Sequence, residues 1–109
     1  MEISTRTSND IHIVSIAGSL DSGTSPDAQK ALDSVLAGAK KVAMDFSKLD
    51  YISSAGLRVL LGAAKKMRAS GGSLRMFGLN QSVKEVFEIS GFSSILSVYP
   101  SEAEALGAM

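Results

Sequence analysis

Several kinds of active site are excluded by residues that this 109-residue sequence lacks. Cysteine is absent, so the chain cannot form a disulfide, use a thiol nucleophile or bind a metal through thiolates. The only histidine is His12, and without a second imidazole it is a poor basis for a metal site or a Ser–His relay. We therefore predict no cofactor, no metal and no catalytic residues.

The chain also has no excess of charge and no long apolar run. Eleven basic and eleven acidic residues cancel, whereas nucleic acids and anionic membranes attract proteins rich in lysine and arginine. The longest apolar run lies around Val59–Ala64, far short of the ~20 residues that span a membrane. Residues Met1–Arg6 contain no apolar signal-peptide core. We expect a cytoplasmic protein that binds neither nucleic acid nor membrane.

What the sequence does contain is typical of a folded domain. Hydrophobic residues make up 45% of the chain and charged residues 20%, which is the balance of a globular protein. The length suits one hydrophobic core, so we predict a single domain over residues 1–109. No pattern in the sequence indicates an oligomeric state.

Hydrophobic periodicity and turn residues divide the chain into strands and helices. Ser25 as cap with Pro26 behind it marks one helix start, and Asn80 is the candidate cap of a later helix. In chain order we expect strands at 2–8 and 11–17, a helix from 25 that ends at Gly38, a strand at 41–46, a helix at 54–69, a strand at 73–77, a helix closed by Gly91, a short strand drawn from Phe92, Ile95, Leu96, Val98 and Tyr99, and a terminal helix that Ser101 opens.

The resulting order, β-β-α-β-α-β-α-β-α, predicts an α/β fold. Strands that alternate with helices lie parallel and are joined by right-handed crossovers. The first two strands are joined by a tight turn at Asn9–Asp10 and should be antiparallel. We therefore expect a mixed, mostly parallel sheet of about five strands with four helices. In the second strand, Val14 and Ile16 should share one face, and Ile11 and Ile13 the other.

Three loops follow the carboxyl ends of strands and should gather at one edge of the sheet, where α/β proteins place their sites. They contain neither histidine nor cysteine, and no P-loop or Rossmann glycine pattern is present. A hydrolase that used Ser54 or Ser53 would lack a base, so binding is favoured over catalysis. The loops are Gly18–Thr24, Ser47–Ser54 and Gly78–Asn80, and their polar residues are Ser19, Asp21, Ser22, Thr24, Ser47, Asp50, Ser53, Ser54 and Asn80, with Asp45 at a strand end.

Ser53 and Ser54 open the helix expected at 54–69 and have two interpretations. A serine hydroxyl can cap a helix by accepting a bond from an orphan backbone N–H. The same place suits a phosphate, because those N–H groups and the helix dipole favour negative charge. Gly56 in the first turn costs ~1 kcal/mol relative to alanine. It indicates either a close approach to the backbone or tight packing of the helix on the sheet.

The segments Gly18–Asp21, Asp45–Ser47 and Ser53–Leu57, followed by a helix that ends at Gly91, together resemble the STAS domain. More narrowly, the chain is similar to the bacterial anti-sigma factor antagonists, also called anti-anti-sigma factors. The resemblance covers essentially the whole chain and includes its length and the order of its elements. It implies a STAS-like fold.

The resemblance also implies a regulatory protein that is switched by phosphorylation and is not an enzyme. Members of the family bind a partner that is both an anti-sigma factor and a serine kinase with a histidine-kinase-like ATP site, and this binding releases the sigma factor. The kinase phosphorylates a serine at a helix start, which ends binding, and a metal-dependent serine phosphatase resets the cycle. That serine lies two residues before the glycine of an Asp-Ser-Ser/Thr-Gly pattern, which assigns the role to Ser54, with Gly56 as the glycine.

This sequence departs from the family pattern at two positions. Ser53 replaces the motif acid and Ala55 precedes the glycine, so Ser53 is an alternative acceptor. Arg58, four residues after Ser54, either pairs with the phosphate or is an ordinary solvated or partner-facing charge. A STAS ligand-binding or scaffold module in a signalling assembly is the alternative function. The residues expected to contact the partner are Asp21, Ser22, Ser53, Ala55, Gly56, Arg58 and Asn80.

Overall fold

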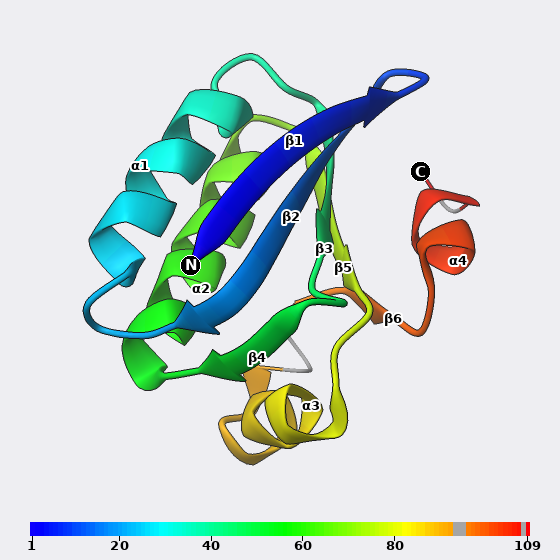
Figure 1. Ribbon diagram of the computed structural model, residues 1–109. Helices are drawn as coiled ribbons and strands as arrows, with labels where there is room; N and C mark the ends of the chain where they lie inside the picture. Colours follow the sequence, from blue (N-terminus) through cyan, green and yellow to red (C-terminus); the bar gives the residue numbers. More distant parts are fainter. Residues whose placement is uncertain (93–95, 108) are drawn as a thin grey trace.

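The computed structural model describes residues 1–92, 96–107 and 109, which form a twisted sheet with helices on both faces (Figure 1). In chain order its elements are β1 (Glu2–Ser8), β2 (Ile11–Leu20), α1 (Ser25–Leu36), β3 (Lys41–Asp45), β4 (Leu49–Ile52), α2 (Ser54–Ala69), β5 (Ser73–Phe77), α3 (Gln81–Ile89), β6 (Val98–Tyr99) and α4 (Glu102–Gly107). The strand order is β1-β2-β3-β5-β6, and β4 pairs with β2 outside this path.

The mixed, mostly parallel α/β fold expected from the sequence is confirmed. Strand β1 is antiparallel to β2, and every other described pair of neighbouring strands is parallel. The described residues contain four helices, as predicted, but six strands rather than about five. The additional strand is β4, which forms within the segment expected to be a loop.

Strand β2 is longer than predicted, because it pairs with two different strands in succession. Its first half pairs with β3, and its last residues, from Gly18 to Leu20, pair with β4. The register shifts between Gly18 and Ser19, where Gly18 adopts a φ of +92° that residues with a side chain rarely allow. The strand expected to end at Ala17 therefore continues for three more residues, through this irregularity to Leu20.

The sequence does not predict strand β4, because buried and exposed residues do not alternate along it. Leu49 and Ile52 are buried at its two ends, while Asp50 and Tyr51 between them are exposed. A strand covered on one face normally alternates with a period of two. The short run of four residues instead reads as an irregular polar segment until its pairing with β2 is known.

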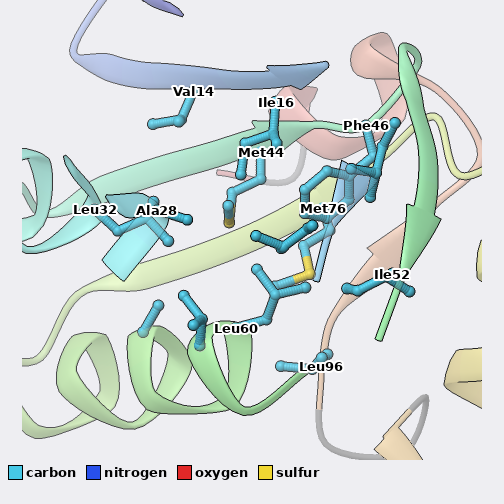
Figure 2. Packing of buried hydrophobic residues seen from close by; sticks show 14 of the residues in the cluster. Val14, Ile16, Ala28, Leu32, Met44, Phe46, Ile52, Leu60, Met76 and Leu96 are labelled. Carbon is cyan, nitrogen blue, oxygen red and sulfur yellow. The ribbon is translucent and has the colours of Figure 1, made fainter. Parts of the chain in front are cut away.

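The two faces of β2 pack against different helices, as the sequence predicts. Val14 and Ile16 lie in the main core with residues of α1, α2 and α3, whereas Ile11 and Ile13 form a smaller cluster with Ala105 of α4. Figure 2 shows the main core, where side chains from the sheet and from the helices on that face meet. Helix α2 is thereby held with one side inward and the other toward solvent.

The predicted start of α1 is wrong by one residue. Ser25 is not the cap but the first helical residue, and the N-cap position belongs to Thr24, which makes no side-chain cap bond. Ser25 is 6% exposed, and its hydroxyl donates to the carbonyl oxygen of Asp21. The cause is the turn before the helix, in which the Asp21 carboxylate accepts the backbone N–H of Thr24 at 3.1 Å.

Other predicted helix ends are confirmed. The side chains of Asn80 and Ser101 cap α3 and α4, accepting backbone N–H bonds at 2.8 and 3.3 Å. Gly38 and Gly91 follow the ends of α1 and α3 with φ of +85° and +78°, the left-handed conformation that stops a helix. Ile95, expected to contribute to the last strand, lies outside the described residues.

Gly56 allows α2 to pack directly on the sheet. A Cβ atom at this position would lie 2.6 Å from the carbonyl oxygen of Leu20, 2.8 Å from Cγ1 of Ile52 and 2.9 Å from Cγ of Leu20. The first of these is backbone, which cannot move aside without shifting β2. Of the two explanations for this glycine, the structure supports close packing of helix on sheet.

We expect Gly56→Ala to destabilise the protein by about 1–3 kcal/mol, because the added methyl overpacks the contact between α2 and Leu20. Gly62→Ala is the matched control in the same helix, because Gly62 is exposed and a Cβ there meets no described atom within 4 Å. It should stabilise the protein by about 0.5–1 kcal/mol. Urea unfolding followed by circular dichroism measures both, and equal effects of the two substitutions would disprove the packing argument.

Candidate functional site

The three loops expected to gather at one edge of the sheet do so. The backbone N–H of Ser53 donates to the carbonyl oxygen of Leu20 at 2.9 Å, which joins the start of α2 to the end of β2. The side-chain Nδ2 of Asn80 donates to the carbonyl oxygen of Leu49 at 2.9 Å, which joins the start of α3 to β4. Strand β4 therefore links the three loops and places two helix N-termini at the same edge.

Ser53 and Ser54 differ in what their hydroxyls do. Ser53 is the N-cap of α2, with φ −99° and ψ 175°, and its Oγ accepts the backbone N–H of Gly56 at 3.3 Å. Its side chain is half-buried. Ser54 is the first residue of the helix and is exposed, and its hydroxyl makes no hydrogen bond within the described residues. Of these two serines, Ser54 is the one that presents an unengaged hydroxyl to solvent.

Asp21 shapes the loop beside these serines. Its Oδ1 accepts the backbone N–H groups of Gly23 at 2.9 Å and Thr24 at 3.1 Å, and its own N–H donates to the Thr24 hydroxyl at 2.9 Å. These bonds fix the turn that follows β2 and leave Ser22 exposed at its tip. The structure therefore brings Asp21 to the candidate site in a half-buried position, with one carboxylate oxygen already engaged.

Two of the residues expected to contact a partner have internal roles at the same edge. Gly56 is buried against Leu20, so its effect on any partner is to set the position of α2. Both polar atoms of the Asn80 amide form hydrogen bonds within the protein. Its Oδ1 accepts the backbone N–H of Val83 and so caps α3, and its Nδ2 donates to the carbonyl oxygen of Leu49. Ala55, by contrast, is half-buried in the first turn of α2.

Arg58 lies one turn beyond Ser54 and is exposed. It lines a shallow groove between α1 and α2, together with Gln29 and Asp33. Sequence reasoning missed Tyr51, an exposed aromatic residue on β4 that is 53% accessible. The signal that could have found it is an aromatic residue that follows Asp50 in the segment expected to be a loop, three positions before the candidate serine.

The composition of this edge suits recognition better than catalysis. Neither histidine nor cysteine is present there, and the described residues contain no group of three or more histidines, cysteines, aspartates or glutamates that could hold a metal ion. No helix in the described part of the chain has the length and apolar character needed to cross a membrane. An exposed serine at a helix N-terminus, flanked by polar loops, is a site at which another protein can act.

Sequence relatives of the chain include a protein of Bordetella bronchiseptica and one of Listeria monocytogenes. BtrV of Bordetella bronchiseptica is 51% identical over 71 residues, which cover 65% of this chain and 61% of BtrV, so the aligned segment spans less than two thirds of that relative. The anti-sigma-B factor antagonist of Listeria monocytogenes is 34% identical over 109 residues, which cover 98% of this chain and 94% of the relative.

Solved structures share the fold. An anti-sigma factor antagonist from Mycobacterium paratuberculosis superposes with a TM-score of 0.90 at 21% identity, covering 98% of this chain and 92% of that one. SpoIIAA, a Bacillus cell fate determinant solved in its phosphorylated form, superposes with a TM-score of 0.73 at 18% identity, covering 98% of each chain. The sequence profile of the STAS domain matches residues 2–105, nearly the full length. The chain belongs to the STAS domain family.

Proposed function

We propose that the protein is an anti-sigma factor antagonist whose binding is switched by phosphorylation of Ser54. In the unphosphorylated form it binds an anti-sigma factor that is also a serine kinase with a histidine-kinase-like ATP site, and so frees the sigma factor. The similarity to the Listeria antagonist over nearly the whole chain supports the class of protein. The observation that carries the site is the exposed, unengaged hydroxyl of Ser54 beside a neighbour committed to capping.

The capping bond of Ser53 favours Ser54 as the acceptor. A kinase must reach the hydroxyl, and Ser54 is exposed whereas Ser53 is half-buried with its Oγ bonded to the N–H of Gly56. Phosphorylating Ser53 would also disturb a helix cap, which is typically worth about 0.5–2 kcal/mol. Ser54 can be modified without breaking a hydrogen bond between described residues, so it has the lower cost.

The fold should tolerate a phosphate on Ser54. A phosphoserine carries about −1.5 to −2 charges at neutral pH, and the N-terminus of a helix favours negative charge. The change therefore acts outward, because a dianion within a binding surface is costly to desolvate against a partner without a matching cation. A metal-dependent serine phosphatase would restore the binding form. SpoIIAA, which shares the fold, has been solved in both unphosphorylated and phosphorylated forms.

Incubation with the anti-sigma factor kinase and Mg-ATP should add one phosphate to the wild-type protein and none to Ser54→Ala. Ser53→Ala should still be phosphorylated, since its neighbouring acceptor is intact. Mass spectrometry of the intact proteins and of their peptides measures the outcome. Full phosphorylation of Ser54→Ala, together with its loss in Ser53→Ala, would move the site to Ser53.

The two serines should also differ in their contribution to stability. Ser53→Ala removes the side-chain cap of α2 and should lower the free energy of unfolding by about 1 kcal/mol. Ser54→Ala removes an exposed hydroxyl and should change it by no more than about 0.5 kcal/mol. Chemical denaturation of both variants tests the assignment of the cap, which a larger loss in Ser54→Ala would contradict.

Ser54→Asp should lose the anti-sigma factor kinase that wild type retains from an extract of the native cell. The carboxylate places negative charge where the phosphate would lie, whereas the control Ser54→Asn has a side chain of similar size without the charge and should retain the partner. Affinity capture followed by identification of the bound protein measures this. Equal retention of the kinase by all three proteins would refute the switch.

A further inference from the structure

The charge on α2 is segregated although the chain is neutral overall. The protein has eleven basic and eleven acidic residues. Helix α2 holds four of the basic residues and no acidic residue, and all four are exposed. They are Arg58, Lys65, Lys66 and Arg68. Helices α1 and α3 carry charges of both signs and α4 carries only acidic residues, so among the described helices the solvent side of α2 alone is wholly basic.

Three of these cations share the side of α2 that carries Ser54. At about 100° per residue, positions 54, 58, 61, 65 and 68 fall within one stripe along the helix. The buried residues of α2 include Leu60, Ala63 and Met67, which face the sheet from the opposite side, while Leu61 within the stripe is half-buried. We call Arg58, Lys65 and Arg68 the α2 basic stripe, and Ser54 lies at its N-terminal end.

The charges of the α2 basic stripe are not compensated by the protein itself. Lys66, to one side of the stripe, pairs with Asp33 of α1. Arg58, Lys65 and Arg68 make no ion pair within residues 1–92, 96–107 and 109. In Figure 1, α1 lies beside α2. The stripe therefore offers three cations to solvent next to the candidate phosphorylation site.

The geometry points to the α2 basic stripe as the surface that docks an acidic patch on the anti-sigma factor. This inference rests on the proposed function. Complementary charges steer two proteins together and set their register, and a stripe of one sign on a neutral protein requires the opposite sign across the interface. The acidic patch must lie beside the partner's kinase site, because Ser54 begins the stripe.

Phosphorylation then acts on the stripe directly. A phosphate of about −1.5 to −2 charges on Ser54 exceeds the single positive charge of Arg58, the nearest cation of the stripe. Arg58, four residues on, lies on the same helical face and can pair with it. The phosphate also faces the partner's acidic patch with charge of the same sign. Release therefore needs no change in the fold of this protein.

The docking surface is tested by titrating the purified anti-sigma factor kinase that wild type retains into wild type and two double variants. Arg58→Gln/Lys65→Gln removes two charges from the stripe and should weaken binding about three- to tenfold at low salt. It should also flatten the dependence of the dissociation constant on salt. The control Lys30→Gln/Lys84→Gln removes two exposed charges from α1 and α3 and should change the constant less than about twofold. Arg58→Lys/Lys65→Arg keeps both charges and should retain the salt dependence of the dissociation constant that wild type shows.

Three results would overturn the inference. Unchanged affinity and salt dependence in Arg58→Gln/Lys65→Gln, with wild type still bound to the kinase, would reject the stripe and leave the proposed function standing. Failure of wild type to bind any anti-sigma factor would reject both. Binding of wild type to a short DNA duplex, lost in the same double variant, would assign the stripe to nucleic acid instead.

Discussion

The carbonyl oxygen of Leu20 is the point on which the start of α2 depends. It accepts the N–H of Ser53 at 2.9 Å, and it would lie 2.6 Å from a Cβ atom on Gly56. One atom of β2 therefore fixes both the last residue before α2 and the closeness of its first turn to the sheet. With the backbone held there, Ser53 turns its hydroxyl inward as a cap and Ser54 projects outward. The candidate site is a consequence of this helix–sheet contact.

The sequence predicts most of the fold because each long element carries its own pattern. The bounds of α2, Ser54–Ala69, follow from its apolar spacing and match the structure. The two faces of β2 follow from its alternation. Strand β4 and the last three residues of β2 do not, because each exists only through pairing with the other across a register shift. A pairing between segments about thirty positions apart leaves little trace in either segment alone.

The candidate site, like the fold, can be predicted from the sequence only in part. Residue types and spacing select the pair Ser53 and Ser54, and the family pattern favours Ser54 through Gly56, but neither shows how the two hydroxyls differ. What separates them is backbone geometry, since a cap requires the extended ψ of 175° found at Ser53. Backbone geometry also explains the wrong prediction for Ser25. Its sequence context predicts a helix cap, but the turn before the helix makes it the first helical residue. The choice of Ser54 as the phosphate acceptor remains a proposal that this geometry supports.

Helix α2 begins with a neutral cap and has no acidic residue in its first turn. With Arg58 as the nearest charge on that face of the helix, the first turns of α2 contribute only positive charge beside Ser54 before modification, while Asp21 lies in the neighbouring loop. A phosphate would thus reverse the sign of the charge that the first turns of α2 present, and would not add to an existing negative charge on the helix. An acidic cap at position 53 would instead take the surface from neutral to strongly negative. Because the cap is a neutral serine, phosphorylation changes the sign of the charge at the start of α2. The unphosphorylated and phosphorylated forms therefore favour partners of opposite charge.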